Sequence, residues 1–314
     1  MQQAVAELGA EGLVDQLEAV ERFKREMKAS AILRSDNVTR ITDADTAPEL
    51  DGAMYLVMEL LDGENLGQVI KRGALSWRRA ATIARDIAMG LGHAHEQGVI
   101  HRDLKPENVV ILRRGKGRQL VKVLDFGLAK LMHEVGPTGA ASEDGPDRSL
   151  TRTGVVFGTP EYMSPEQASG QPVDERSDIY ALCVLFHELL CLKHYLSDRA
   201  TLKDMLAGVA SQEAPLASMI KSPHQDSPPM DLTWFVRAGL AKDPTKRYPS
   251  VQAMIERLER RAEGRIPIEC PITLLKQATN TWLRILDKYP IFMVFVIAGL
   301  FLLLIGSFVA GHWR

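Results

Sequence analysis

The chain has 314 residues, of which 46% are hydrophobic and 25% are charged. Its 38 basic and 40 acidic side chains leave a formal charge of −2, which excludes a strongly basic nucleic-acid binder and a highly charged disordered chain. The length fits one large domain or two ordinary ones. The three cysteines are too few and too scattered for a disulfide scaffold or a CxxC metal site, so we expect reduced thiols at Cys183, Cys191 and Cys270.

The first half of the chain predicts helices and short strands. Apolar residues recur at helical spacing over residues 11–33, and AMYLVMEL at residues 53–60 is typical of a strand. Residues 75–97 predict a longer amphipathic helix. Two short β-type runs follow at residues 109–112 and 120–124, and the basic turn RRGKGRQ joins them.

The second half predicts a loop followed by helices. Residues 133–148 are rich in Gly, Pro, Ala, Ser and Asp, which is typical of a mobile loop. Helical patterns follow at residues 178–192, 232–241 and 251–262. Residues 272–286 have an amphipathic character, which predicts either a helix along a membrane surface or a connecting helix packed on the body.

An apolar run near the C-terminal end predicts a membrane anchor. Residues 291–311 contain no charged side chain, and about 20 residues of helix span the hydrocarbon core of a bilayer. Lys276, Arg284 and Lys288 precede the run and only Arg314 follows it, which favours a cytoplasmic body. We therefore expect a single-pass protein of the cell (inner) membrane with the lipid bilayer as a partner. The run contains no GxxxG pair that would indicate a dimer, and a dimer stays open.

Two motifs carry the residues of a phosphoryl-transfer site. Residues 101–108 read HRDLKPEN, and DFG begins 17 positions after Asn108. Phosphoryl transfer needs a carboxylate near the attacking hydroxyl, cations around the phosphates and oxygen ligands for Mg²⁺. Asp103, Lys105, Asn108 and Asp125 supply these groups, and Gly127 allows a sharp backbone turn after the last of them. The two motifs at this spacing are strong evidence for the chemistry.

Because of these motifs, the chain from about residue 20 to residue 261 resembles the protein kinase family, and specifically the bacterial serine/threonine kinases of eukaryotic type. Three further motifs support the resemblance: GTPEYMSPE at 158–166, SDIY at 177–180 and KDPTKRY at 242–248. The resemblance implies an α+β, bilobal fold with a reduced N-lobe and a mostly helical C-lobe, to which the predicted C-terminal transmembrane helix is added. We expect a partial N-lobe over 1–60, a C-lobe over 61–262, a juxtamembrane linker over 263–290 and the transmembrane helix over 291–311.

The resemblance also implies roles for the catalytic residues. Asp103 would accept or orient the proton of a substrate Ser or Thr hydroxyl, and Lys105 would stabilise the transferring phosphoryl group of ATP. Asn108 and Asp125 would hold Mg²⁺. The expected partners are therefore protein substrates, with ATP and Mg²⁺ as cofactors.

Other residues are implied to bind the nucleotide or to support the site. Residues 58–61 resemble the hinge, where the backbone of Glu59 and Leu61 would bind adenine, and Glu64 would reach the ribose. Glu26 matches the helix glutamate that usually pairs with a lysine on the third strand. The resemblance further implies three structural residues, namely Glu166 and Arg247 as a buried pair and Asp178 as an anchor of the catalytic loop.

The loop between Asp125 and Glu166 carries hydroxyl groups that are candidates for regulation. Ser149, Thr151 and Thr153 lie in SLTRTG, and threonines at this place often take phosphate in the family that the chain resembles. A phosphate there would pair with Arg102 and order the loop. The alternative is that they are ordinary polar loop residues.

The sequence departs from the kinase pattern at its start. No GxGxxG precedes Glu26, and the first lysine of the chain is Lys24, so the glycine-rich loop and the strand lysine are absent. One explanation is an N-terminally incomplete or divergent kinase. The other is a catalytically impaired pseudokinase that acts as a membrane-tethered scaffold. We expect a membrane-anchored serine/threonine protein kinase in signalling, with the scaffold as the alternative.

Overall fold

The computed structural model describes residues 32–47, 53–73, 75–115, 118–126, 159–220 and 226–265, together with 275, 278–279 and 281–282. The chain divides into two compact units, 1–258 and 259–314. In the second unit the described residues are the end of the last helix and a few helical positions. Among all described residues, no helix is both long and apolar enough to cross a bilayer. The predicted span at 291–311 lies outside them.

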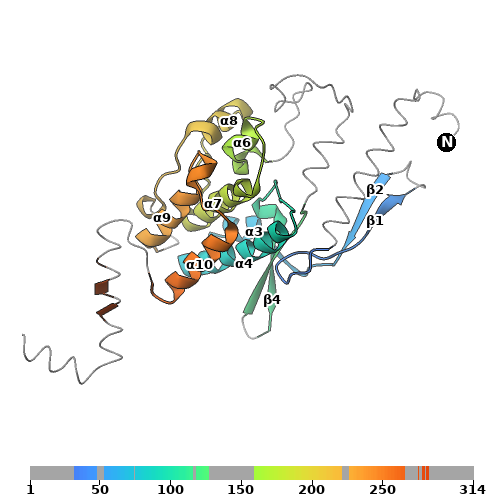
Figure 1. The fold of residues 1–314 in the computed structure, drawn as a ribbon, viewed down its shortest axis with the longest axis horizontal. Helices are drawn as coiled ribbons and strands as arrows, with labels where there is room; N and C mark the ends of the chain where they lie inside the picture. The colour runs from blue at the N-terminus through green and yellow to red at the C-terminus, as the bar shows by residue number, and fades with distance from the viewer. Residues whose placement is uncertain are drawn as a thin grey trace, which may run out of the picture. The chain divides into compact units, whose positions relative to one another are not determined.

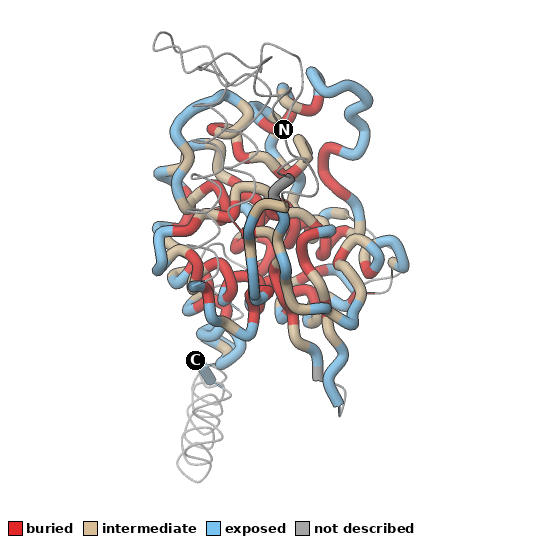
Figure 2. The backbone as a smooth tube through the Cα atoms, turned by 90° about the vertical axis from the view of Figure 1, so that its right-hand side faces the viewer, coloured by how far each residue is buried: buried red, intermediate tan, exposed pale blue. Residues whose placement is uncertain are grey.

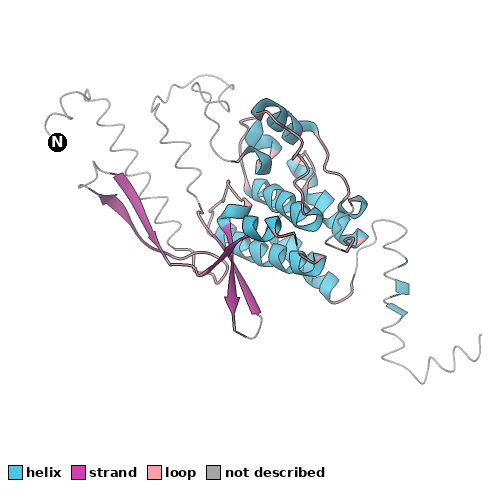
Figure 3. Ribbon diagram, turned by 180° about the vertical axis from the view of Figure 1, so that it is seen from behind, coloured by secondary structure: helices cyan, strands magenta, loops and turns pink. Residues whose placement is uncertain are grey.

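Two antiparallel sheets form in the first unit (Figure 3). In the two-stranded sheet, β1 pairs with β2, and in the three-stranded sheet the order is β3-β4-β5. The strands are β1 (Ile41–Ala47), β2 (Ala53–Met58), β3 (Gly63–Asn65), β4 (Val109–Arg114) and β5 (Arg118–Val123). Strands β4 and β5 bury their apolar residues on one side, with Val109, Val121 and Val123 almost fully covered. The apolar face of this sheet therefore belongs to the same hydrophobic core as the helices.

The helices gather around α7 (Figure 1). They are α3 (Leu66–Lys71), α4 (Trp77–Glu96), α6 (Pro165–Ala168), α7 (Glu175–Cys191), α8 (Leu202–Ser211), α9 (Met230–Gly239) and α10 (Val251–Ala262). Short 3₁₀ turns lie at Pro106–Asn108, Pro160–Tyr162, Ala217–Met219 and Pro244–Lys246. Helix α4 contacts both α7 and β5, and α9 packs on α7.

The core follows from the apolar pattern of α4 and α7. Ile83, Ile87 and Leu91 repeat at helical spacing on α4 and are at most 1% exposed. Helix α7 is apolar on all sides, and 14 of its 17 residues are buried. Figure 2 shows the buried residues in red. A helix that is apolar all round must lie inside the protein, so α7 is the element on which the rest is assembled.

Most of the predicted elements in the described region are confirmed. The α+β class holds, and α10 has the predicted bounds. Helix α7 begins at Glu175 rather than 178, because the side chain of Asp174 accepts the N–H of Arg176 and caps the helix. Strand β2 ends at Met58 rather than at residue 60. Most of the predicted helix at 11–33, the loop at 133–148 and most of residues 272–286 lie outside the described residues, and Leu33 is not helical.

Candidate active site

The catalytic loop at residues 101–108 is fastened to the core by one buried aspartate. Asp178 lies in the first turn of α7 and is 1% exposed. It accepts the backbone N–H groups of His101 at 2.8 Å and Arg102 at 2.9 Å, and the side chain of His95 donates to it at 2.8 Å. Burial alone would raise the pKa of Asp178, but these hydrogen bonds lower it below its ordinary value. The predicted anchoring role of Asp178 is confirmed.

Two residues at the site have left-handed backbone conformations. Arg102 has φ of 67° and Asp125 has φ of 60°, and residues other than glycine rarely adopt such values. The strained turn at Arg102 is held by Asp178 on its N–H and by Gln167, whose side chain donates to the Arg102 carbonyl at 2.7 Å. Such conformations persist only where the surroundings enforce them, and they cluster at functional sites.

The three predicted groups of the catalytic loop lie together. The Nζ atom of Lys105 is 2.6 Å from Oδ2 of Asp103. The side-chain amide of Asn108 donates to the carbonyl of Asp103 at 2.9 Å. Both Asp103 and Lys105 keep about a fifth to a quarter of their side chains exposed, at 24% and 21%. A carboxylate and an ammonium group are therefore presented together to an incoming substrate.

Asp125 joins this cluster from the end of β5. The N–H of Leu124 donates to the Asn108 carbonyl at 2.9 Å, and the buried ring of His101 donates to the Leu124 carbonyl at 2.8 Å. Burial raises the pKa of Asp125; His101 and Lys105 oppose this shift, and the nearby Asp103 carboxylate adds to it. The rings of His101 and Phe126 meet edge to face with centroids 4.7 Å apart. His101 is fully buried, so it is a packed core residue.

The donor atoms at this site fit Mg²⁺. Asp125 is a half-buried carboxylate whose pKa is raised, which a divalent cation would relieve, and Asn108 supplies an amide oxygen from the neighbouring loop. Among the described residues, no group of three or more His, Cys, Asp or Glu is placed to hold a metal. Mg²⁺ ordinarily takes one or two carboxylates plus water and substrate phosphates, so this sparse donor set suits it.

The predicted hinge and Asp125 line the same cavity. Residues of β2, of the segment before β1 and of the DFG motif surround a space of about 300 Å³ that includes its open mouth. The lining includes Val38, Leu56, Met58, Asp125 and Phe126. Leu60, just beyond β2, is 98% exposed. Met58, the first residue of the predicted hinge, therefore lines the same apolar cavity as the predicted metal ligand Asp125.

Glu64, which is predicted to reach the ribose, pairs with arginine side chains in the structure. It is on β3, where its carboxylate pairs with both guanidinium nitrogens of Arg72 and lies 3.8 Å from Arg113. The hydrogen bonds from Arg72 lower the pKa of Glu64. Its role at the ribose stays a prediction. Glu26, Gly127, Ser149, Thr151 and Thr153 all lie outside the described residues.

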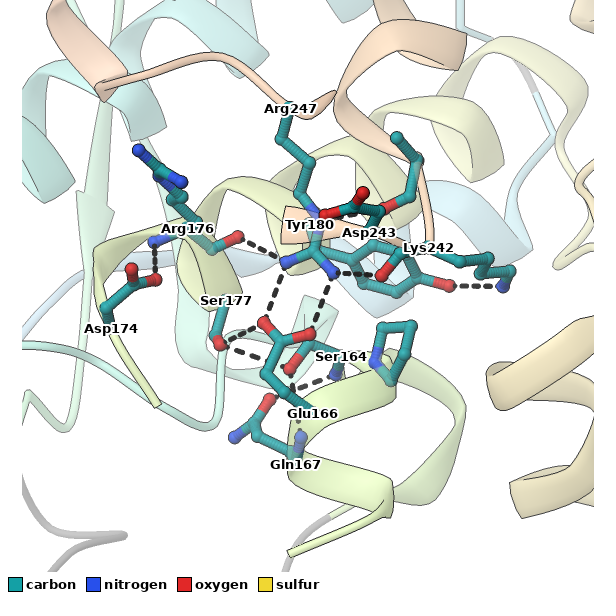
Figure 4. A network of polar contacts seen from close by, with 12 residues as sticks. Ser164, Glu166, Gln167, Asp174, Arg176, Ser177, Tyr180, Lys242, Asp243 and Arg247 are labelled. Carbon is teal, nitrogen blue, oxygen red and sulfur yellow. Dashed lines mark hydrogen bonds and ion pairs between the residues drawn. The ribbon is translucent and has the colours of Figure 1, made fainter. Parts of the chain in front are cut away.

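The predicted pair of Glu166 and Arg247 is present and buried (Figure 4). The two guanidinium nitrogens of Arg247 donate to the two carboxylate oxygens at 2.7 and 2.8 Å, and Ser177 also donates to Glu166. Burial would raise the pKa of Glu166, but Arg247 and Ser177 lower it. The pair joins α6 to the segment before α10, close to the catalytic loop.

Two polar pairs were not predicted from the sequence. Tyr162 donates to Glu188 of α7 at 2.6 Å, and Lys122 of β5 bonds to Glu59 at 2.7 Å. Burial raises the pKa of Glu188 to about 7, with Glu161 adding to the effect. The only sequence signal was a lysine inside the apolar run VKV and a glutamate inside an apolar helix, and neither identifies a partner.

Comparison with known proteins agrees with this geometry. Residues 7–257 match the protein kinase domain family. The kinase domain of PknI from Mycobacterium tuberculosis superposes with a TM-score of 0.54 at 22% identity, over 78% of this chain and 79% of that one, which supports the fold. The predicted protein-kinase-like fold is therefore confirmed.

The chain belongs to the protein kinase family. It is 38% identical over 242 residues to the serine/threonine-protein kinase pkn3 of Myxococcus xanthus, and 34% identical over 249 residues to PknB of Mycolicibacterium smegmatis. These alignments cover 76% and 78% of this chain but only 42% and 36% of the two relatives. The predicted resemblance to bacterial serine/threonine kinases is confirmed, and the chain spans less than half the length of these relatives.

Proposed function

We propose that this chain is a serine/threonine protein kinase that transfers the γ-phosphate of ATP to protein hydroxyl groups. The observation that carries the proposal is the joint placement of Asp103, Lys105 and Asn108 on a loop held by Asp178, next to Asp125. Serine/threonine kinases among the relatives support the substrate class.

In this proposal each side chain acts on the transfer through its position. Asp103 accepts the proton of the attacking hydroxyl, and Lys105, 2.6 Å away, offsets the charge that develops on the phosphoryl oxygens. Asn108 and Asp125 would hold Mg²⁺, which neutralises phosphate charge when it is bound. The backbone of 59–61 orients the adenine, so the reactants meet in a fixed geometry.

The test is γ-phosphate transfer by the intact chain, with Asp103→Asn as the matched control. Loss of a general base lowers the rate by about 100-fold or more, so we expect clear transfer by the parent chain and almost none by the variant. Equal rates in both would contradict the proposal. A parent chain that binds a partner protein but transfers no phosphate would instead support the scaffold alternative, which the complete set of Asp103, Asn108 and Asp125 does not favour.

We also propose that residues 291–311 anchor the protein in the membrane with its body in the cytoplasm. The support is the 21-residue run without a charged side chain. Membrane pelleting tests this: the intact chain should sediment with membranes and resist extraction by carbonate, whereas a chain that ends at residue 290 should be released. An intact chain that stays in the supernatant would contradict the anchor.

Regulation by phosphorylation at Ser149, Thr151 and Thr153 is a further part of this proposal. Arg102 precedes the catalytic aspartate and is the expected partner of a phosphate there. Phosphosite mapping after incubation with ATP should find phosphate on at least one of the three. If mapping finds it only outside 149–153, the assignment is wrong.

A further inference from the structure

Lys122 is a buried lysine at an unusual place. It lies on β5 between Val121 and Val123, and it is 7% exposed. Lysine is almost never this buried unless it is paired. Its Nζ atom donates to Oε1 of Glu59 at 2.7 Å and to the Val38 carbonyl at 3.0 Å. Lys122 therefore joins β5 to two segments that lie 63 and 84 positions away in the sequence.

Glu59 is the first residue after β2 and the second residue of the predicted hinge at 58–61. Its Oε1 atom accepts a second hydrogen bond from the N–H of Arg40 at 2.8 Å, and its own N–H donates to the Arg40 carbonyl at 3.0 Å. Burial would raise the pKa of Glu59, but the bonds from Lys122 and Arg40 lower it. The carboxylate is therefore held from two sides while the next residue, Leu60, is exposed.

The segment that contacts Glu59 is itself fixed on β5. The side chain of Asn37 donates to the Val121 carbonyl at 2.8 Å. The N–H of Thr39 donates to the Val123 carbonyl at 2.9 Å, and the N–H of Val123 donates to the Asn37 carbonyl at 2.9 Å. Lys122 thus completes a closed set of contacts among residues 37–40, Glu59 and β5. We call this set the hinge clasp.

The clasp connects the two parts of the cavity already described. Asp125 lies three residues after Lys122 on the same chain segment, and Met58 lies directly before Glu59. Both line the same cavity. A change in the Lys122–Glu59 contact would move the backbone of the hinge relative to Asp125.

A role in stability alone explains the pair poorly. A buried ion pair is often no more stabilising than apolar residues of similar size, because two charges must be removed from water. Val110 is the cross-strand partner of Lys122, and Leu120 lies on the same face of β5, so a leucine or methionine would suit this position. What the ion pair adds is a defined position for Glu59, since a charged hydrogen bond has a preferred distance and direction.

We propose that Lys122 is a positioning residue that holds Glu59, and with it the hinge backbone of 59–61, in place for the nucleotide. The inference rests on the proposed function, because it assigns the hinge to ATP. Lys122 does not itself touch the reacting atoms. Its effect reaches the nucleotide through Glu59.

The experiment measures the affinity of the intact chain for the non-hydrolysable analogue AMP-PNP with Mg²⁺ by calorimetry. Lys122→Met should weaken binding by about fivefold or more, within the range by which residues in a contact network alter coupling. Lys122→Arg keeps the positive charge and a donor for Glu59, so it should lose less affinity than Lys122→Met. Arg114→Met is the matched control, because it removes an exposed cation from the neighbouring strand β4.

Thermal unfolding and kinetics separate positioning from a merely structural role. In the positioning role, KM for ATP rises together with Kd while kcat falls less. A Lys122→Met chain that has a lower Tm but binds AMP-PNP as the parent does would overturn the inference alone. A parent chain with no affinity for AMP-PNP would overturn the proposed function, and the inference with it.

A second variant covers the case in which Lys122→Met does not fold. Combining Lys122→Met with Glu59→Gln removes both charges, so that no unpaired charge is left in the interior. This double variant should fold and should show the same loss of affinity. Parent-like affinity in the double variant would overturn the proposal.

Discussion

At the scale of single residues, Glu188 has surroundings that make the stability of the protein depend on pH. It accepts a hydrogen bond from Tyr162 inside the protein, and burial raises its pKa to about 7, with Glu161 and Glu107 adding to the effect. The folded state therefore binds a proton on Glu188 more tightly than the unfolded state, where an ordinary glutamate has a pKa near 4.3.

The first prediction concerns this proton. Because folding raises the pKa of Glu188, ionising this residue destabilises the folded state. This destabilisation is absent below the pKa of the unfolded state, grows as pH rises from about 4.5 to 7, and then stays constant. Glu188→Gln removes it, so the variant should gain on the order of 2–3 kcal/mol over the parent between pH 5 and pH 8. Urea unfolding at a series of pH values measures the difference, and a difference that does not change with pH would contradict the prediction.

Arg247 is the second residue with a sharp prediction. It and Glu166 are both almost completely buried, so loss of one leaves an unpaired charge. Arg247→Met should lower the free energy of unfolding by about 3–5 kcal/mol. Arg237→Met is the control, since its pair with Glu213 is exposed and should contribute less than about 1 kcal/mol. Denaturant unfolding of the two variants checks this, and equal losses would contradict it.

At the scale of elements, the contact between α7 and α9 depends on a glycine. A Cβ atom at Gly239, the last residue of α9, would overlap the Sγ atom of Cys183 on α7. The two helices therefore approach closely at this point, and the buried thiol fills the space that the missing side chain leaves. Burial raises the pKa of Cys183 to about 12, so this thiol is an inert packing group.

Gly239→Ala should therefore destabilise the protein by about 1–3 kcal/mol, because a well-packed core does not accept an added methyl group. Cys183→Ala in the same chain should recover part of the loss by opening space. Gly92→Ala on α4 is the matched control, since its new Cβ would meet only Ile255 at 3.9 Å, and alanine favours a helix over glycine. Thermal unfolding compares the three, and a stable Gly239→Ala chain would show that α9 shifts without cost.

The elements also show what the sequence could predict. Helix α10 was predicted with its observed bounds because its apolar positions follow a regular helical period. Strand β1 reads ITDADTA and carries little apolar signal, so it forms through pairing with β2 rather than through its own pattern. Helix α8 was missed because only three of its ten residues are buried.

The same distinction holds in the site. Asp103, Lys105 and Asn108 were predicted because they lie within six positions and form a recognisable motif. Lys122 and Glu59 are 63 positions apart, and nothing in either local sequence indicates the other. Contacts of this kind depend on how the strands pack, which local pattern does not encode.

At the scale of the whole molecule, the buried α7 links the loop at residues 101–108 to the core. Its first turn holds the catalytic loop through Asp178, and its middle packs against α4 and α9. Ser177, next in sequence to Asp178, also reaches Glu166 and so connects the pair with Arg247 to the same helix. The loop, the buried ion pair and the core are therefore expected to lose their structure together.

The anchoring of a loop by a fully buried carboxylate has a consequence for amide hydrogen exchange. Loop amides usually exchange quickly, because local opening exposes them to water. The N–H groups of His101 and Arg102 can be released only if Asp178 leaves the interior, which requires α7 to unfold. Their exchange should therefore be as slow as that of amides in the middle of α7, and it should speed up in Asp178→Asn. Mass spectrometry of peptides that cover residues 99–104 would reveal a catalytic loop with the protection of a core helix.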